Sequence, residues 1–149
     1  MGLPRPVATE VQLNGSYKFM YDNFVIATQR DLYVFLQKSG EVLKGLKFGF
    51  LVYRYGYPND EIGHPFMDCG LGYYGLYQIE NSPWVQEIRG QNSAHPKDTV
   101  FLHVGMRHYI IRFKDVTLEV IAKDFHEIEI STGGLDSLIS SELQCFTPE

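Results

Sequence analysis

Residues 107–122 read RHYIIRFKDVTLEVIA, and this stretch decides the fold class. In its first half, apolar side chains occupy every second position, which is the period of a β-strand. Lys114 and Asp115 supply a short turn, and the alternation resumes from Val116 to Ala122. The stretch therefore predicts an antiparallel β-hairpin.

The opposite face of this hairpin carries ionisable side chains. His108 and Arg112 share that face, and Glu119 lies on the partner strand, with Arg54 expected nearby. We interpret this arrangement as cross-strand ion pairing. An anion-binding site on the same face is the alternative.

Several further runs have strand character. The clearest is Leu46 to Tyr55, which is apolar on both faces and is therefore expected at the centre of a sheet. Gly49, in the middle of this run, is expected to permit a bend or a close approach of another strand. The other runs are 16–21, 24–28, 31–38, 73–79, 100–104 and 125–130. The run 31–38 also fits a one-turn helix.

Two segments have helical character. Ser82 and Pro83 are a typical N-cap and first helical residue, so a short helix is expected over residues 83–90. Apolar residues at helical spacing predict a second short helix over 135–143, with its apolar stripe covering the sheet.

Together these elements predict a mainly β (α+β) fold. We expect an antiparallel barrel or a strongly curled sheet of about seven to eight strands, with one or two short helices. Residues 1–149 are expected to form a single domain. Pro4 and Pro6 predict an extended N-terminal arm over residues 1–14, and residues 144–149 are expected to be a tail.

Composition narrows the classes of function. The formal net charge of −5 argues against nucleic-acid binding and against docking on anionic lipid, because both need clustered Lys and Arg. The two cysteines, Cys69 and Cys145, match no metal-ligand spacing and are expected to be free thiols. The sequence has no apolar run long enough to span a bilayer, so a cytoplasmic location is expected.

The most unusual composition lies between Tyr53 and Tyr77, which is dense in Tyr, Gly, Pro and acids. Exposed Tyr and Trp are good anchors for a partner, because they bring large rigid area and a polar tip. The candidate binding residues in and near this stretch are Tyr55, Tyr57, Asp60, Glu61, His64, Tyr73, Trp84 and His95.

Two functions are consistent with these residues. The first is a non-enzymatic binding protein, of the immunity or inhibitor type, whose acidic, Tyr-rich loop surface takes a protein partner with a basic surface. The alternative is a small-molecule or hydrolytic site at the mouth of a β-barrel around His64 and His95, with His64 as acid or base. We expect neither a metal nor a cofactor, and catalysis is the less favoured function. A homo-oligomer built through a strand edge or the C-terminal helix is a further hypothesis.

Overall fold

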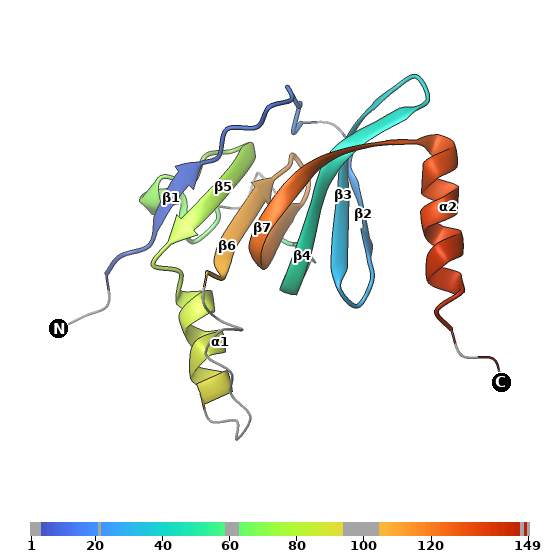
Figure 1. The fold of residues 1–149 in the computed structure, drawn as a ribbon. Helices are drawn as coiled ribbons and strands as arrows, with labels where there is room; N and C mark the ends of the chain where they lie inside the picture. The colour runs from blue at the N-terminus through green and yellow to red at the C-terminus, as the bar shows by residue number, and fades with distance from the viewer. Residues whose placement is uncertain (1–3, 21, 59–62, 94–104, 147, 149) are drawn as a thin grey trace.

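The structure is a computed structural model that describes residues 4–20, 22–58, 63–93, 105–146 and 148. It contains one antiparallel sheet of seven strands, flanked by two helices at opposite ends (Figure 1). A mainly β, α+β fold is therefore confirmed. The strands are β1 (Val7–Glu10), β2 (Phe24–Ala27), β3 (Asp31–Ser39), β4 (Val42–Gly56), β5 (Gly75–Glu80), β6 (Arg107–Arg112) and β7 (Thr117–Ser131).

The sheet is open, and the prediction of a barrel or a strongly curled sheet is wrong for the described part of the chain. Its strand order is β1-β5-β6-β7-β4-β3-β2, so β1 and β2 are the edges. Each edge strand has only four residues and pairs on one side within the described ranges. A barrel closes when its two edge strands pair in register along their length, and edge strands of four residues are too short for such pairing.

The hairpin that decides the fold class is confirmed. β6 and β7 pair antiparallel, with Arg112 opposite Thr117, and Phe113 donates its backbone N–H to Val116 O at 3.0 Å across the turn. β7 then continues to Ser131, so the separate strand predicted over 125–130 is its second half. The predicted strand over 31–38 is confirmed as β3.

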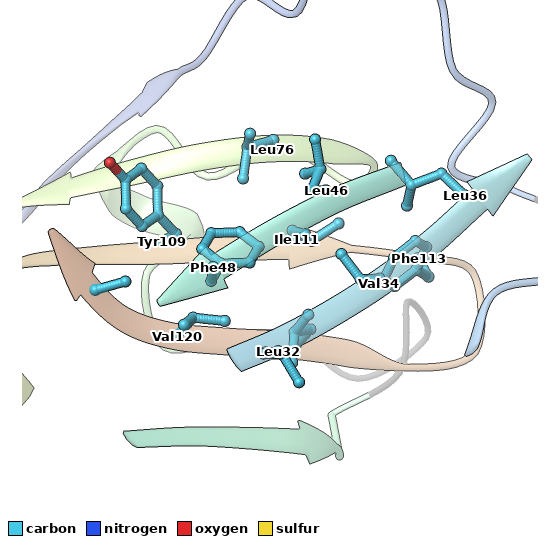
Figure 2. Close-up of a cluster of buried hydrophobic side chains, with 12 residues drawn as sticks. Leu32, Val34, Leu36, Leu46, Phe48, Leu76, Tyr109, Ile111, Phe113 and Val120 are labelled. Atoms are coloured by element: carbon cyan, nitrogen blue, oxygen red, sulfur yellow. The ribbon is translucent and has the colours of Figure 1, made fainter. Parts of the chain in front are cut away.

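One face of the sheet holds the hydrophobic core (Figure 2). The side chains that alternate toward this face on the β6–β7 hairpin include Tyr109, Ile111, Leu118 and Val120, all buried. They pack with buried residues of the other strands, among them Leu32, Val34, Leu46, Phe48 and Leu76. The alternation read from the sequence therefore sets which face is apolar.

The N-terminal segment lies across this core. Residues 16–21 were predicted as a strand, but the described part of this segment has no strand; Tyr17 and Phe19 instead pack against the core from outside the sheet. Glu127 of β7 holds the segment: its carboxylate accepts from the backbone N–H groups of Asn14 and Gly15, both at 2.8 Å, and from the Tyr17 hydroxyl at 3.0 Å. Upstream of it, the expected arm contains strand β1, which pairs with β5.

The two helices behave differently. Helix α1 (Pro83–Ser93) begins where predicted, since Ser82 Oγ accepts from the Val85 backbone N–H at 3.2 Å, and it continues past the predicted end at residue 90. Helix α2 (Thr132–Leu143) is capped by Ser131, whose Oγ accepts from Gly134 N at 2.9 Å. No residue of α2 is buried, and its main contact is with β7, so the expectation that it covers the sheet is wrong.

Candidate functional site

The candidate binding residues lie in two places. Tyr55, Tyr57 and Tyr73 lie at one end of the sheet. His64 lies on the face opposite the hydrophobic core, and Trp84 packs against His108 on that face. Asp60, Glu61 and His95 lie outside the described residues.

Strand register explains why the three tyrosines share one end. Gly56 of β4 lies opposite Thr117, Thr117 opposite Arg112, and Arg112 opposite Gly75 of β5. This row crosses three strand spacings, or about 14 Å. Tyr55 and Tyr57 flank one end of the row, and Tyr73 precedes the other.

Two of these side chains are largely open to solvent. Tyr57 is 77% exposed and Tyr73 is 61% exposed. Aromatic side chains of this size gain free energy when they are buried, and these two forgo that gain. The chain around Tyr57 is fixed in place because the Thr117 hydroxyl donates to the carbonyl of Pro58 at 2.6 Å. This hydrogen bond ties the segment that carries Tyr57 to β7.

Acidic groups adjoin this end of the sheet. A small hollow of about 170 Å³ beside Tyr55 is lined by Asp22, Asn23, Lys114 and Asp115 among others. The Tyr55 hydroxyl donates to Asn23 Oδ1, and partial burial raises the pKa of this phenol. The hollow is smaller than the roughly 300–1,000 Å³ of typical small-molecule pockets. We call Tyr55, Tyr57, Tyr73, Asp22 and Asp115 the tyrosine end.

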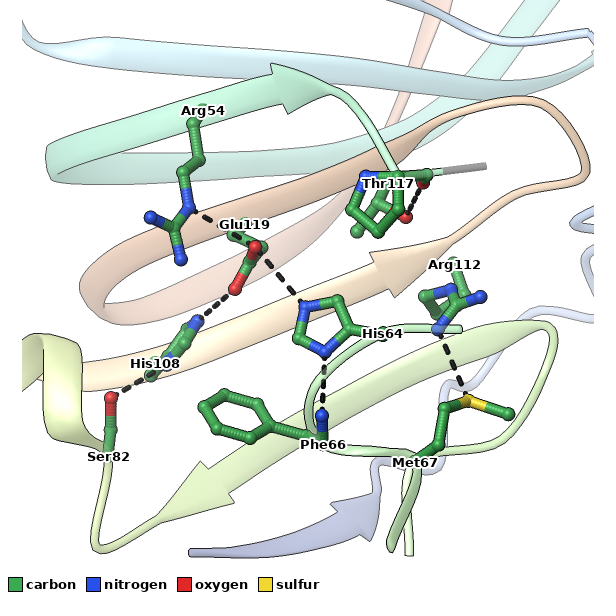
Figure 3. A network of polar contacts seen from close by, with 10 residues as sticks. Arg54, His64, Phe66, Met67, Ser82, His108, Arg112, Thr117 and Glu119 are labelled. Carbon is green, nitrogen blue, oxygen red and sulfur yellow. Dashed lines mark hydrogen bonds and ion pairs between the residues drawn. The ribbon is translucent and has the colours of Figure 1, made fainter. Parts of the chain in front are cut away.

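On the other face, Glu119 is the centre of a buried polar network (Figure 3). Its Oε1 lies 2.8 Å from Nε2 of His108, and its Oε2 lies 3.2 Å from Nε of Arg54 and 3.4 Å from Nε2 of His64. Nδ1 of His108 lies 2.7 Å from Ser82 Oγ. The network therefore joins β4, β6 and β7 to the start of α1 and to the segment that follows residue 62.

Hydrogen bonding sets the tautomer of His64. Its Nδ1 accepts from the backbone N–H of Phe66 at 3.0 Å, so that nitrogen carries no proton. The proton of a neutral His64 then lies on Nε2 and points to Glu119.

The environment of His108 favours its neutral form. Burial lowers its pKa, and this outweighs the opposing effect of the hydrogen bond to Glu119. A neutral ring satisfies both contacts when Nε2–H donates to Glu119 and Nδ1 accepts from the Ser82 hydroxyl.

Glu119 is the charged member. Burial alone raises the pKa of its carboxyl, but the hydrogen bonds from His108, His64 and Arg54 outweigh burial and hold the pKa well below the usual range. The carboxylate is therefore ionised and is balanced by Arg54, whose guanidinium carbon lies 4.1 Å from the centre of the Trp84 ring.

The order Ser82, His108, Glu119 matches the order of contacts in a nucleophile–base–acid relay. Two observations show that the Ser82–His108 end of this order is enclosed in this conformation. Ser82 is only 4% exposed, and its Oγ already caps α1. The Trp84 ring lies edge-on to His108 with ring centres 5.3 Å apart.

The sequence indicated part of this network. The predicted cross-strand pairing of Glu119 is confirmed for His108 and Arg54. Arg112 instead lies buried with Nη1 3.5 Å from Met67 Sδ. The link from Glu119 to His64 and the contact of Ser82 with His108 were missed, because each joins residues that are far apart in the sequence.

Other site chemistry has little support. Among the residues that the structure describes, no group of three or more His, Cys, Asp or Glu is placed to hold a metal ion. Cys69 and Cys145 are both free thiols. Within the described ranges, no helix has the length and apolar character needed to cross a membrane.

Comparison with known proteins gives no relative. No protein-family model, curated protein or solved structure matches the chain.

Proposed function

We propose that this chain is a non-enzymatic, cytoplasmic binding protein that takes a protein partner with a basic surface at its tyrosine end. The observation that carries the proposal is the exposure of Tyr57 and Tyr73 at one end of a rigid sheet. Exposed aromatic side chains on a rigid support are typical anchors of protein interfaces, because little conformational entropy is lost when they are buried.

Charge favours a basic partner. Asp22 and Asp115 lie beside Tyr55, with Lys114 as the basic residue that lines the same hollow. The chain as a whole carries a formal charge of −5. Such a field speeds the encounter with a positively charged surface and fixes its orientation. Immunity and inhibitor proteins are a class that works in this way.

A photo-crosslinking residue placed at Tyr57 or Tyr73 tests the proposal in cells that make the protein. Lys38 is the control position, because Ser39 and Val42 pair at the opposite end of β4 from Gly56. We expect one crosslinked protein of basic isoelectric point from positions 57 and 73 and none from position 38. Equal crosslinking at all three positions would rule out the tyrosine end as the surface that binds the partner.

The purified partner then gives a quantitative test. We expect Tyr57→Ala to weaken binding by about 30-fold, as for a hot-spot residue, and added salt to weaken it further. Lys38→Ala is the matched control and should leave affinity unchanged. Binding that is insensitive to both Tyr57→Ala and salt contradicts the proposal.

The second candidate is a hydrolytic site around His64, and the Ser82–His108–Glu119 order of contacts is the observation that favours it. It requires that the start of α1 moves to uncover Ser82. A fluorophosphonate probe distinguishes the two functions: the binding protein stays unlabelled, whereas a hydrolase is labelled and loses the label in Ser82→Ala.

A further inference from the structure

A large groove lies between α2 and the β2 edge of the sheet. Its volume is about 960 Å³, and its lining includes Ile26 and Ala27 from β2 and Leu138, Ile139 and Leu143 from α2. Figure 1 shows α2 standing beside the β2–β3 hairpin at the side of the sheet remote from α1.

Helix α2 lacks the packing that a helix of its length needs. It has 12 residues, and isolated helices shorter than about 12–15 residues are marginal in water. None of its residues is buried, and Leu143 and nearby Phe146 are 62% and 75% exposed. Its apolar stripe therefore lies open along one wall of the groove.

The opposite wall is an unprotected sheet edge. β2 reads FVIA, with no charge and no proline, and it pairs only with β3 in the described part of the sheet. Natural edge strands usually carry charges or prolines that prevent pairing with another chain. An edge without them, next to an open apolar helix, is typical of a covered interface.

Charges around the groove select the occupant. The groove is lined by Arg30 and Asp31 at the β2–β3 turn and by Glu142 on α2. The charged residues within α2 are Asp136 and Glu142, both acidic. A uniformly basic partner would meet Arg30, and a uniformly acidic one would meet Glu142. The mixed pattern is complemented by the same surface turned through 180°.

We infer that the groove is the interface of a two-fold homodimer, in which α2 of each copy packs into the groove of the other. Glu142 of one copy then meets Arg30 of its partner, twice over. A two-fold contact uses the same patch on both copies and closes after two chains, so it forms a dimer and no filament. This inference is independent of the partner proposed for the tyrosine end.

Charge exchange tests the contact itself. We expect the wild-type chain to sediment at twice 17.1 kDa and to dissociate on dilution. Arg30→Glu and Glu142→Arg should each weaken the dimer at least tenfold, because each places like charges opposite one another. Lys38→Glu and Glu87→Arg make the same charge changes at exposed residues that do not line the groove, and they should leave the dimer intact.

Mixing the two groove variants gives the decisive result. In a mixed dimer both contacts regain opposite charges, so an equimolar mixture of Arg30→Glu and Glu142→Arg should dimerise more tightly than either variant alone. A wild-type chain that stays at 17.1 kDa at all concentrations overturns the inference. The inference is also overturned if the equimolar mixture dimerises no more tightly than each variant does alone.

Discussion

His108 Nε2 lies 2.8 Å from Glu119 Oε1, and both side chains are buried on the face of the sheet that lacks the main core. The pair is a diagonal cross-strand contact, since His108 lies opposite Ile121 and Glu119 opposite Ile110. A buried carboxylate is tolerated there because three side chains donate to it.

Removing the carboxylate should destabilise the protein strongly. Glu119→Ala leaves His108 and His64 without their acceptor and leaves Arg54 without its partner. We expect a loss of about 3–5 kcal/mol in the free energy of unfolding, measured by urea denaturation. Glu129→Ala, which removes an exposed pair with Lys44 on the same strand, should cost less than about 1 kcal/mol. Equal losses would mean that Glu119 has no special role.

Stability should fall as the pH falls, in two steps. The folded state holds the pKa of His108 below its ordinary value, so the unfolded chain binds a proton first, near pH 6.5. Stability is therefore full above that pH and declines below it. Glu119, whose folded pKa is also lowered, adds a second loss below about pH 4.3. Urea denaturation at a series of pH values measures both steps.

A histidine variant identifies the upper step. His108→Gln should remove the loss of stability between about pH 6.5 and 5, although the variant is less stable overall. His126→Gln changes an exposed histidine of β7 and should leave the profile unaltered. If the upper step survives in His108→Gln, another group is responsible for it.

Substitution by alanine should change the stability of the protein differently at two glycines of β4. A Cβ on Gly45 would lie 2.0 Å from the carbonyl oxygen of Val34 on β3, whereas a Cβ on Gly49 meets nothing within 4 Å. We expect Gly45→Ala to cost about 3 kcal/mol and Gly49→Ala to be neutral or slightly stabilising, as judged by thermal unfolding. A neutral Gly45→Ala would show that β3 and β4 separate at low cost.

The carboxylate of Glu127 should control the ionisation of Tyr17. Burial, the hydrogen bond to Glu127 and its charge raise the pKa of the Tyr17 phenol to about 12. In Glu127→Gln the charge is gone, so we expect the pKa of Tyr17 to move toward 10, measured by NMR titration of labelled tyrosine. The amides of Asn14 and Gly15 should also exchange faster with solvent. Glu129, on the same strand, makes a smaller contribution to this pKa, so Glu129→Gln should lower the pKa of Tyr17 less than Glu127→Gln does.

The sequence predicted the elements whose signals are local. The β6–β7 hairpin follows from alternation and a short turn, and the start of α1 follows from Ser82 and Pro83. A bend or a close approach of another strand was expected at Gly49. The pairing of β4 with β7 shifts register between Phe48 and Phe50, around Gly49, whereas the close approach occurs at Gly45, which lies opposite Phe35 where the β3–β4 register shifts. The register of two strands at a bulge depends on both of them, so it cannot be predicted from the sequence of one strand alone.

The candidate site was predictable only in part for the same reason. Glu119 and His108 are close in sequence, and their pairing was expected. His64 is 55 residues from Glu119, and nothing local indicates that they meet. Sheet closure and the packing of α2 are also long-range properties. They depend on which edges pair and on which surfaces the rest of the chain reaches.

The strand order has a consequence for the time course of folding. β2, β3 and β4 are successive antiparallel neighbours, as are β5, β6 and β7, and in the described part of the sheet the two groups pair through β4 and β7. That seam joins residues as far apart in the sequence as Val42 and Ser131. Closing so long a loop is entropically costly, so we expect each group of three strands to form early and the seam to limit the folding rate. Because Glu119 and Arg54 lie on opposite sides of the seam, their ion pair would assemble in the last step.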